Sequence, residues 1–418
     1  MPRYSLSRYL VEIHIVLQKD LRRMTEKSHI PVRSDATDYG VSRFFQNQTF
    51  HFQTLRALND IAANGADLNE VLTAISTIPD GDTNAWFDAF SSLAMRTEDR
   101  IRACADPLSN GYAWLRAHNY WRTAEFLLHS DDRRRKSTWT REIAAFDNGL
   151  KLAGIAHERF TIPYEAGCLR GILYPGPDGW QKKPLIVLVG GYDSTLEELY
   201  FVLAKAAHER GYGVLTYEGP GQGGVLREYG LTFTPEWEKP TAAVLDYFEA
   251  TQFRPKKIVL VGMSMGGYLA PRAAAFDPRI TGVVAYDVLF DMGSIAERYA
   301  TLAQNPEASK NPDLVWAVDN ALWTLGVRTL PEAVEAIRPY TLQDVAGKIT
   351  ADVLILVGEY DHFIPASQAD DFSKACTAAK SVETVTFDAL SGGAEHCQLG
   401  AQTLWHAAFF SWMIRKFN

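Results

Sequence analysis

The sequence is poor in cysteine, and its few cysteines follow no pattern. Only four occur in 418 residues, and none belongs to a Cys-x-x-Cys pair. This spacing argues against a disulfide framework and against a cysteine-based zinc site. Scattered single cysteines indicate reduced thiols, so we expect an intracellular protein.

Long apolar runs are also lacking. No stretch of eighteen uncharged apolar residues occurs anywhere in the chain, so we expect no membrane span. The apolar patch within residues 1–24 is interrupted by Glu12 and His14 and lacks a small-residue cleavage site, which argues against a secretory signal. We therefore predict a soluble, cytoplasmic protein and leave association with vesicles open.

Clusters of positive charge are scarce as well. The formal net charge is -8, and the one conspicuous basic run, DDRRRK at 131–136, contains its own acids. Such a run is typical of a solvated turn, whereas a nucleic-acid-binding surface needs an uncompensated basic patch. We expect no nucleic-acid partner.

The chain has ample material for a globular core, with 47% hydrophobic and 12% aromatic residues. Residues 1–155 show helical spacing, as in GYAWLRAHNYWRTAEFLLHSDD, where apolar residues recur every three or four positions. They contain almost no alternating β-branched segments. We therefore predict an N-terminal helical domain over residues 1–155.

From residue 156 onward, strands and helices alternate. Continuous apolar runs such as KKPLIVLVGG, KKIVLVGMS and ADVLILVGEYD are typical of buried parallel strands. The alternation predicts an α/β fold over 156–418 with a mostly parallel, doubly wound sheet. A helical insertion at about 292–347 is expected to form a lid above the carboxyl ends of the strands.

One serine lies between glycines at the end of a predicted strand. Gly262-Met263-Ser264-Met265-Gly266 matches G-x-S-x-G between a strand and a helix, which is the context that this motif requires. Small residues allow a turn so sharp that the hydroxyl of Ser264 is exposed above the sheet. We predict that Ser264 is a nucleophile.

A serine hydroxyl needs a base to remove its proton, and the base needs an orienting acid. Asp361 follows the strand LILVG, and His396 lies in a glycine-rich loop after the last predicted strand, which gives the order Ser, Asp, His that this architecture demands. Cys397 follows His396, but adjacent side chains diverge and no further ligands are evident. We expect no metal.

Acyl transfer also needs donors for a developing oxyanion. One predicted donor is the backbone N–H of Met265, the residue after the nucleophile. The other is expected from the glycine-rich loop after the strand LIVLV, through the N–H of Gly191 or Tyr192.

Several longer strings resemble a known group of enzymes. GGYDSTLEELYF, YEGPGQGGVLRE, FTPEWEKPTAAVLDYF, VGMSMGGYLAPRAAAFDPRI and GGAEHCQ resemble the fungal yellowish-green pigment hydrolases, which are α/β-hydrolases that shorten polyketides. A more distant likeness is to the bacterial dihydroxypseudooxynicotine hydrolase, which cuts a carbon–carbon bond. LRAHNYWRTAEFLLH is similar to their helical domain, so the resemblance covers most of the chain.

The resemblance implies hydrolysis of a carbon–carbon bond in a β-dicarbonyl polyketide, with Ser264, Asp361 and His396 as the triad and no cofactor. It also implies a homodimer formed through the N-terminal domain. A bulky aromatic substrate implies an apolar pocket between the helical domain and the sheet, for which the candidate lining residues are Tyr120, Tyr192, Trp316 and Trp323. Asp287 ends the strand VVAYD and is expected to be either a polar substrate contact or a structural cap.

Two alternatives remain open at this stage. The same triad would serve an ester or lactone hydrolase, or an acyltransferase or cyclase, because all of these pass through an acyl-enzyme. The second alternative is a binding protein that keeps the fold without catalysis.

Overall fold

The computed structural model describes residues 43–101, 103–177, 183–251, 255–305 and 311–417. Residues from Asn47 onward form one compact unit that includes both the helices of the first third and the sheet. Residues 1–42, on which the prediction of no secretory signal depends, lie outside the described residues. Among the described helices, none is both long and apolar enough to cross a membrane.

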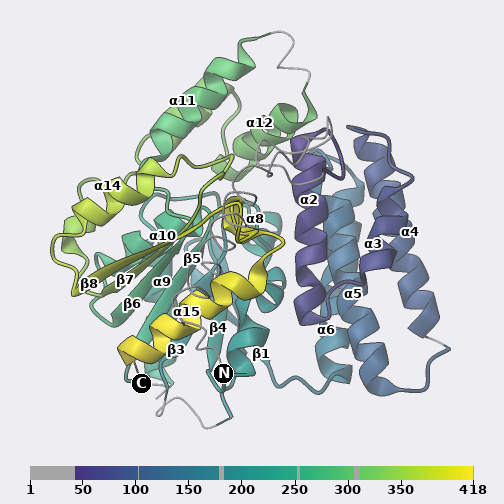
Figure 1. Cartoon of the computed structure of the whole chain (residues 1–418), viewed down its shortest axis with the longest axis horizontal. Coiled ribbons are helices and arrows are strands. Elements are labelled where there is room, and N and C mark those ends of the chain that lie inside the picture. Colours follow the sequence, from purple (N-terminus) through teal and green to yellow (C-terminus); the bar gives the residue numbers. More distant parts are fainter. Residues whose placement is uncertain (1–42, 102, 178–182, 252–254, 306–310, 418) are drawn as a thin grey trace, which may run out of the picture. The chain divides into compact units, whose positions relative to one another are not determined.

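The described part of the first third is helical, and Figure 1 shows its long helices side by side. Its elements are α2 (Gln48–Asn59), η1 (Asp60–Ala63), α3 (Leu68–Ile75), α4 (Thr83–Ile101), α5 (Pro107–Phe126) and α6 (Arg134–Leu152). Helix α2 begins where the side chain of Asn47 accepts the Phe50 N–H, which is a standard N-cap. The last of these helices ends at Leu152, and the first strand begins at Glu158. The division of the chain into a helical domain and a hydrolase domain remains a prediction.

The described strands form one eight-stranded sheet in the order β1-β2-β4-β3-β5-β6-β7-β8. The first two strands pair antiparallel, β2 pairs antiparallel with β4, and the remaining pairs are parallel. The prediction of a mostly parallel sheet is therefore confirmed. The strands are β1 (Glu158–Tyr164), β2 (Gly167–Tyr174), β3 (Leu185–Val189), β4 (Val214–Glu218), β5 (Ile258–Met263), β6 (Ile280–Tyr286), β7 (Asp352–Gly358) and β8 (Ser381–Phe387).

Helices cover both faces of the sheet, because the side chains of the central strands are buried on both faces. In β3, Val187 packs in one core with α9 (Glu238–Ala250) and α10 (Gly266–Ala274), while Leu188 packs in the other core with α15 (Gln402–Phe417). The further elements of this part are η2 (Tyr200–Ala204), α7 (Lys205–His208), α8 (Gly223–Tyr229) and α14 (Ser367–Ala375).

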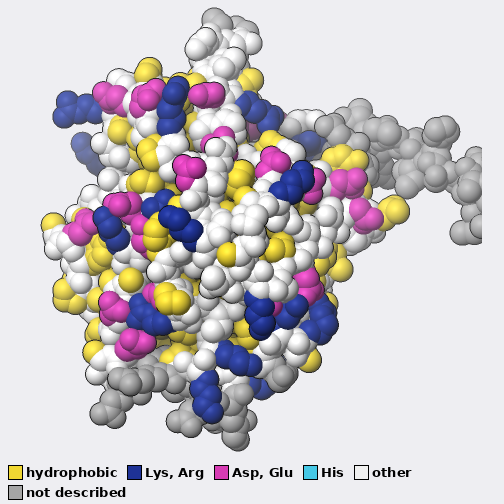
Figure 2. Space-filling view, turned by 90° about the vertical axis from the view of Figure 1, so that its left-hand side faces the viewer, with side chains coloured by type: hydrophobic (Ala, Val, Ile, Leu, Met, Phe, Trp, Pro, Cys, Tyr) yellow, Lys and Arg dark blue, Asp and Glu magenta, His cyan; other side chains and the backbone are white. Residues whose placement is uncertain are grey.

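A helical segment separates β6 from β7, as the sequence predicts. It contains α11 (Met292–Ala303), α12 (Pro312–Leu325) and α13 (Leu330–Ile337). Figure 1 shows α11 and α12 beyond the ends of the strands, on the side where β5 and β6 end. On the face in Figure 2, Lys and Arg side chains are interspersed with Asp and Glu side chains.

Candidate active site

Ser264 occupies the turn between β5 and α10. Its backbone has φ of 58°, in the left-handed region that non-glycine residues rarely adopt. A Cβ on Gly262 would lie 1.8 Å from the carbonyl oxygen of Gly266, and a Cβ on Gly266 would lie 2.9 Å from the carbonyl oxygen of Val189. The two motif positions therefore exclude any side chain, as the sequence indicates, and the strained turn presents the hydroxyl at the end of the strand.

The structure brings Ser264, His396 and Asp361 into one hydrogen-bonded line. The Nε2 atom of His396 lies 2.9 Å from Ser264 Oγ, and Nδ1 lies 2.6 Å from Asp361 Oδ2. Asp361 follows β7, and its Oδ1 accepts the backbone N–H groups of Phe363 and Ile364 at 2.8 and 2.9 Å. These bonds fix the carboxylate, so Nδ1 of His396 carries the proton and Nε2 accepts the serine O–H.

The electrostatics of this line favour a strong base. Burial lowers the pKa of His396, but the charge of Asp361 and the hydrogen bond to it outweigh burial and raise that pKa above its usual range. Burial likewise raises the pKa of Asp361, and the charge of His396 outweighs it and lowers the pKa below the usual value. The ionised form of Asp361 is therefore favoured, and it is placed to stabilise a positively charged imidazole ring at His396.

A second carboxylate, Asp287, lies beside the same histidine. Its Oδ2 is 3.4 Å from His396 Nδ1 and accepts the backbone N–H of Cys397, while its Oδ1 lies 3.3 Å from Gln398 Nε2. Both Cys397 and Gln398 have positive φ, so their backbone needs such support. Burial and the negative charge of Asp361 raise the pKa of Asp287.

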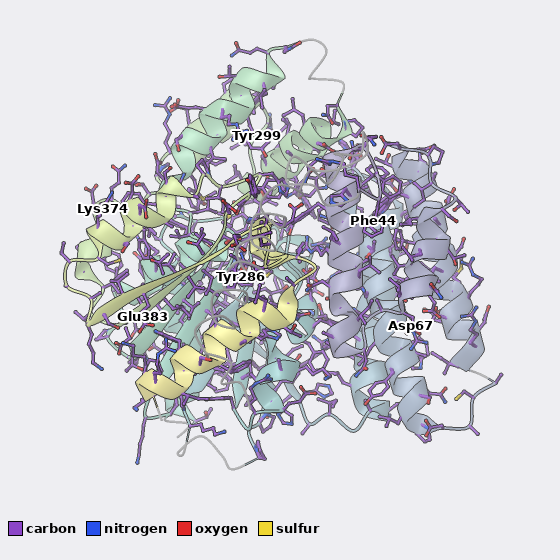
Figure 3. The ribbon with its side chains drawn as sticks, viewed as in Figure 1. Phe44, Asp67, Tyr286, Tyr299, Lys374 and Glu383 are labelled. Carbon is purple, nitrogen blue, oxygen red and sulfur yellow. The ribbon has the colours of Figure 1, made fainter. Side chains whose placement is uncertain are left out.

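These contacts separate the two roles expected of Asp287. It is 1% exposed and does not belong to the described residues that line the cavity beside Ser264, which favours the structural role over a substrate contact. It is a structural cap that holds the loop of His396. Its neighbour in the chain, Tyr286, lies at the end of β6 and is labelled in Figure 3.

The expected backbone donors are only partly available. The N–H of Gly191 donates to Ser194 Oγ at 2.9 Å and is therefore occupied. Within the described residues, no acceptor is recorded for the N–H of Tyr192 or of Met265. Of the two candidates after β3, Tyr192 thus keeps a free donor and Gly191 does not.

Gly191 has a different requirement, which is space. A Cβ at this position would lie 2.8 Å from Ser264 Cβ and 3.1 Å from Ser264 Oγ. The glycine therefore lets the loop after β3 approach the serine closely, and only this residue type fits.

A cavity of about 220 Å³ opens beside Ser264 and His396. Tyr192 and Trp316, two of the predicted residues, line it. Tyr299 of α11, which Figure 3 labels, also lines it. Most of the other lining side chains are apolar, among them Leu289, Ile295, Val318, Leu330, Val334 and Phe363. An enclosed apolar space of this kind suits an organic substrate of low polarity.

Two of the predicted aromatic residues, Tyr120 and Trp323, do not line this cavity. The hydroxyl of Tyr120 donates to Glu70 Oε2 at 2.8 Å and accepts the N–H of Asp67, which ties α5 to the α3 region. The ring of Trp323 packs against the guanidinium groups of Arg135 and Arg227, at 4.5 and 5.2 Å. Both are structural contacts.

Sequence reasoning missed the wall that α2 contributes. Phe52 and Arg56 of α2 line the cavity together with Asp60, the C-cap of α2 and first residue of η1. They are spaced four residues apart, so they lie along one side of this segment. The helical spacing of this segment is visible in the sequence, but nothing in the sequence tells which face turns toward Ser264.

Three side chains of types that can bind a metal lie close together near Ser264. The side-chain donor atoms of Asp287, His396 and Cys397 lie within 4.8 Å of one another, although adjacent side chains were expected to diverge. Both ring nitrogens of His396 are already engaged, by Ser264 and Asp361. The cluster therefore belongs to the hydrogen-bond network of the histidine loop.

Comparison with known proteins agrees with this geometry. Residues 185–398 match the family described as alpha/beta hydrolase, which spans half of the chain. This chain belongs to the alpha/beta hydrolase family. The predicted fold is thereby confirmed at the level of the family as well as of the sheet.

Within the alpha/beta hydrolases, fungal enzymes are similar over nearly the full length. Hydrolase acrC of Aspergillus aculeatus is 31% identical over 90% of this chain and 98% of that protein. The 20-hydroxy-prefusarin hydrolase FUS2 of Gibberella moniliformis is 30% identical, again over 90% of this chain and 98% of that protein. The crystal structure of 2,6-dihydroxy-pseudo-oxynicotine hydrolase shares the fold, with a TM-score of 0.68 at 24% identity, over 85% of this chain and 94% of that one. The predicted resemblance to fungal hydrolases is confirmed.

Proposed function

We propose that this alpha/beta hydrolase is a serine-dependent enzyme that cleaves a carbon–carbon bond in a β-dicarbonyl polyketide through an acyl-enzyme. The observation that carries the proposal is the hydrogen-bonded line from Ser264 through His396 to Asp361 in the wall of an apolar cavity. A serine placed this way needs no metal or organic cofactor to attack a carbonyl.

The first half of the reaction forms the acyl-enzyme. His396 Nε2 takes the proton of Ser264 Oγ while Oγ attacks a ketone carbon, and the carbonyl electrons move onto its oxygen. The N–H groups of Tyr192 and Met265 hold this oxyanion. Collapse restores the carbonyl and breaks the adjacent carbon–carbon bond, and the bonding electrons leave as an enolate.

The second half regenerates the enzyme. His396 donates its proton to the leaving enolate, then removes a proton from water as the water attacks the acyl-enzyme, and finally returns that proton to Ser264. Throughout these steps Asp361 holds the histidine tautomer. A carbanion can leave only when a neighbouring carbonyl delocalises its charge, which is why a β-dicarbonyl compound suits this site.

The comparisons support a specialised small-molecule substrate. One relative is named as a hydrolase of 20-hydroxy-prefusarin, and the relatives at 30% identity or more that we compared are fungal hydrolases. The aromatic side chains of Tyr192 and Trp316, whose ring centroids are 6.5 Å apart, would contact a flat substrate in the cavity.

The test is product analysis with a panel of substrates. Incubation with hexaketide and heptaketide naphthopyrones, followed by mass analysis of both fragments, is expected to show release of acetate or acetoacetate together with a shortened aromatic product. Turnover of p-nitrophenyl esters and lactones without such release would contradict carbon–carbon cleavage and favour the ester hydrolase. Acyl transfer would appear as a product that retains both fragments.

Replacing Gly191 with alanine is expected to lower kcat by at least about 100-fold and also to lower Tm, because the added Cβ would lie 2.9 Å from the carbonyl oxygen of Met263. The added Cβ would displace Ser264 Oγ, and a displacement of about 1 Å at the reacting atom has an effect of this size. The matched control is Gly347→Ala, where the nearest neighbour of the added Cβ is the Thr377 hydroxyl at 3.3 Å, far from the serine in the chain. Wild-type kcat in Gly191→Ala would show that the close approach of this loop does not matter.

We also propose that the protein forms a homodimer and is located inside the cell. Both derive from the resemblance and from cysteine usage. Sedimentation of the full chain tests the first, and a mass of one chain, 46.7 kDa, would contradict it.

A further inference from the structure

One wall of the cavity is a face of α2 that changes from apolar to polar along its length. Phe52 lies next to His396, with ring centroids 6.1 Å apart. Arg56 and Asp60 follow at intervals of four residues and line the same cavity. At about 1.5 Å per residue, they lie roughly 6 and 12 Å farther along the helix than Phe52. The polar end is therefore one to two helical turns from Phe52, the residue beside His396.

Arg56 is held rigidly at this polar end. Its Nη2 lies 2.7 Å from Glu198 Oε2 and 3.1 Å from Asp193 Oδ1, and its Nε also donates to Glu198. Asp193 directly follows Tyr192, so Arg56 is tied to the loop that supplies the proposed oxyanion donor. Among the described residues, no acceptor is recorded for Nη1 of Arg56. The guanidinium is thus neutralised and fixed, with one nitrogen left to donate.

Asp60 is the unusual group of this wall. It is 7% exposed, lines the cavity and, within the described part of the chain, its carboxyl makes no hydrogen bond and no ion pair. Burial and the nearby charge of Glu198 raise the pKa of Asp60 well above its usual range. This shift favours the protonated form of the carboxyl, which can donate through its O–H.

We propose that Asp60, together with Arg56, forms a subsite that donates hydrogen bonds to a keto or enol oxygen of the substrate, remote from the carbonyl that Ser264 attacks. The rest of the cavity is mostly apolar, so an oxygen-bearing substrate would find its complementary donors chiefly here. The proposal rests on the proposed function, because a polyketide carries such oxygens at regular intervals and a simple aliphatic ester does not.

A protonated carboxyl makes a specific prediction about its amide replacement. Asp60→Asn keeps the shape, the neutrality and a donor, whereas Asp60→Leu replaces the carboxyl with a larger apolar group that cannot donate. If Asp60 were ionised instead, Asp60→Asn would lower kcat/KM as Asp60→Leu does, because the amide would lack the charge that faces Arg56. The two variants together therefore report what Asp60 does as well as whether it matters.

The experiment measures kcat/KM of both variants on the polyketide that the product analysis identifies and on p-nitrophenyl hexanoate, whose acyl chain carries no further oxygen. Asp60→Leu is expected to lower kcat/KM for the polyketide about 10- to 100-fold and to leave the ester within twofold. Asp60→Asn is expected to stay within about threefold of wild type on both. Equal losses on both substrates in Asp60→Leu, or an equal loss in Asp60→Asn and Asp60→Leu, would overturn the proposal.

Failure of the proposed function has a distinct signature. If the wild type hydrolyses esters but releases no carbon–carbon cleavage product, the substrates become p-nitrophenyl hexanoate and p-nitrophenyl 5-oxohexanoate. If Asp60→Leu then lowers kcat/KM only for the oxo ester, the subsite is upheld without the carbon–carbon reaction. If Asp60→Leu lowers kcat/KM equally for the two esters, the subsite is overturned.

Discussion

Replacement of Ser264 by alanine is expected to lower kcat by roughly 10⁴- to 10⁶-fold while the protein stays folded. Removal of the nucleophile from a serine–histidine–aspartate unit abolishes the acyl-enzyme route, and only binding and oxyanion stabilisation remain. Alanine also removes a side-chain atom from a residue with φ of 58°, so we expect no large change in Tm. The measurement is steady-state turnover of the polyketide and of p-nitrophenyl hexanoate.

Ser137→Ala is the matched control, because Ser137 lies exposed on α6 and bonds only the backbone of its own helix. It should retain wild-type kcat. Turnover in Ser264→Ala within tenfold of wild type would rule out covalent catalysis at this residue, and loss of activity on one substrate class alone would indicate two different sites.

The second large effect is expected at Asp361, and it should far exceed that at Asp287. Asp361→Asn should lower kcat by about 10³- to 10⁴-fold, because an amide that donates to His396 stabilises the wrong tautomer. Asp287→Asn should cost at most about tenfold, since the amide oxygen still accepts the N–H of Cys397 and the bond between Asp361 and His396 is kept.

The pH dependence separates the two acids further. His396 must be neutral to accept the serine proton, so kcat/KM falls as the pH drops through its pKa. Asp361 raises that pKa, so the acid limb should lie above the ordinary histidine value of about 6.5. In Asp361→Asn the remaining influence of burial lowers the pKa, so the limb should move to lower pH.

A limb that moves more in Asp287→Asn than in Asp361→Asn would assign the orienting role to Asp287. Equal losses of kcat in the two variants would indicate that both carboxylates orient His396 through Nδ1. Circular dichroism of both variants guards against unfolding as the cause.

The convergence of Ser264, Asp361 and His396 could be predicted from the sequence because the fold orders these residues along the chain. A serine between glycines after a buried strand specifies its own turn, and the clashes calculated for Gly262 and Gly266 show why no other residue fits there. Asp361 and His396 follow the last two strands, whose carboxyl ends meet at one edge of the sheet. Order along the chain therefore sufficed to find them.

The cavity walls could not be predicted in the same way, because they depend on which side of a helix faces inward. Tyr120, Trp316 and Trp323 are all aromatic residues in helices, yet of these three only Trp316 lines the cavity. Asp60 looks like an ordinary solvated acid at the end of a helix until its burial is known. Packing between distant segments decides these roles, and a single sequence does not encode it in a local pattern.

The backbone donors show a similar limit. The sequence places Gly191 and Tyr192 in the right loop, but the choice between them depends on one hydrogen bond to Ser194 Oγ. That bond follows from the conformation of the turn after β3. The role of Asp287 likewise depends on its reach to the loop of Cys397, across the carboxyl end of the sheet.

The central claim is that Ser264 carries the acyl group during cleavage. Its most direct test is rapid acid quench of the enzyme with the polyketide, followed by tryptic digestion and mass analysis of the peptide Ile258–Arg272, which contains Ser264. The account predicts an acyl adduct on Ser264 that appears within the first turnover and is missing in Ser264→Ala. Full product release from wild-type enzyme with no adduct on that peptide at any time in the first turnover, and with Ser264→Ala equally active, would contradict it.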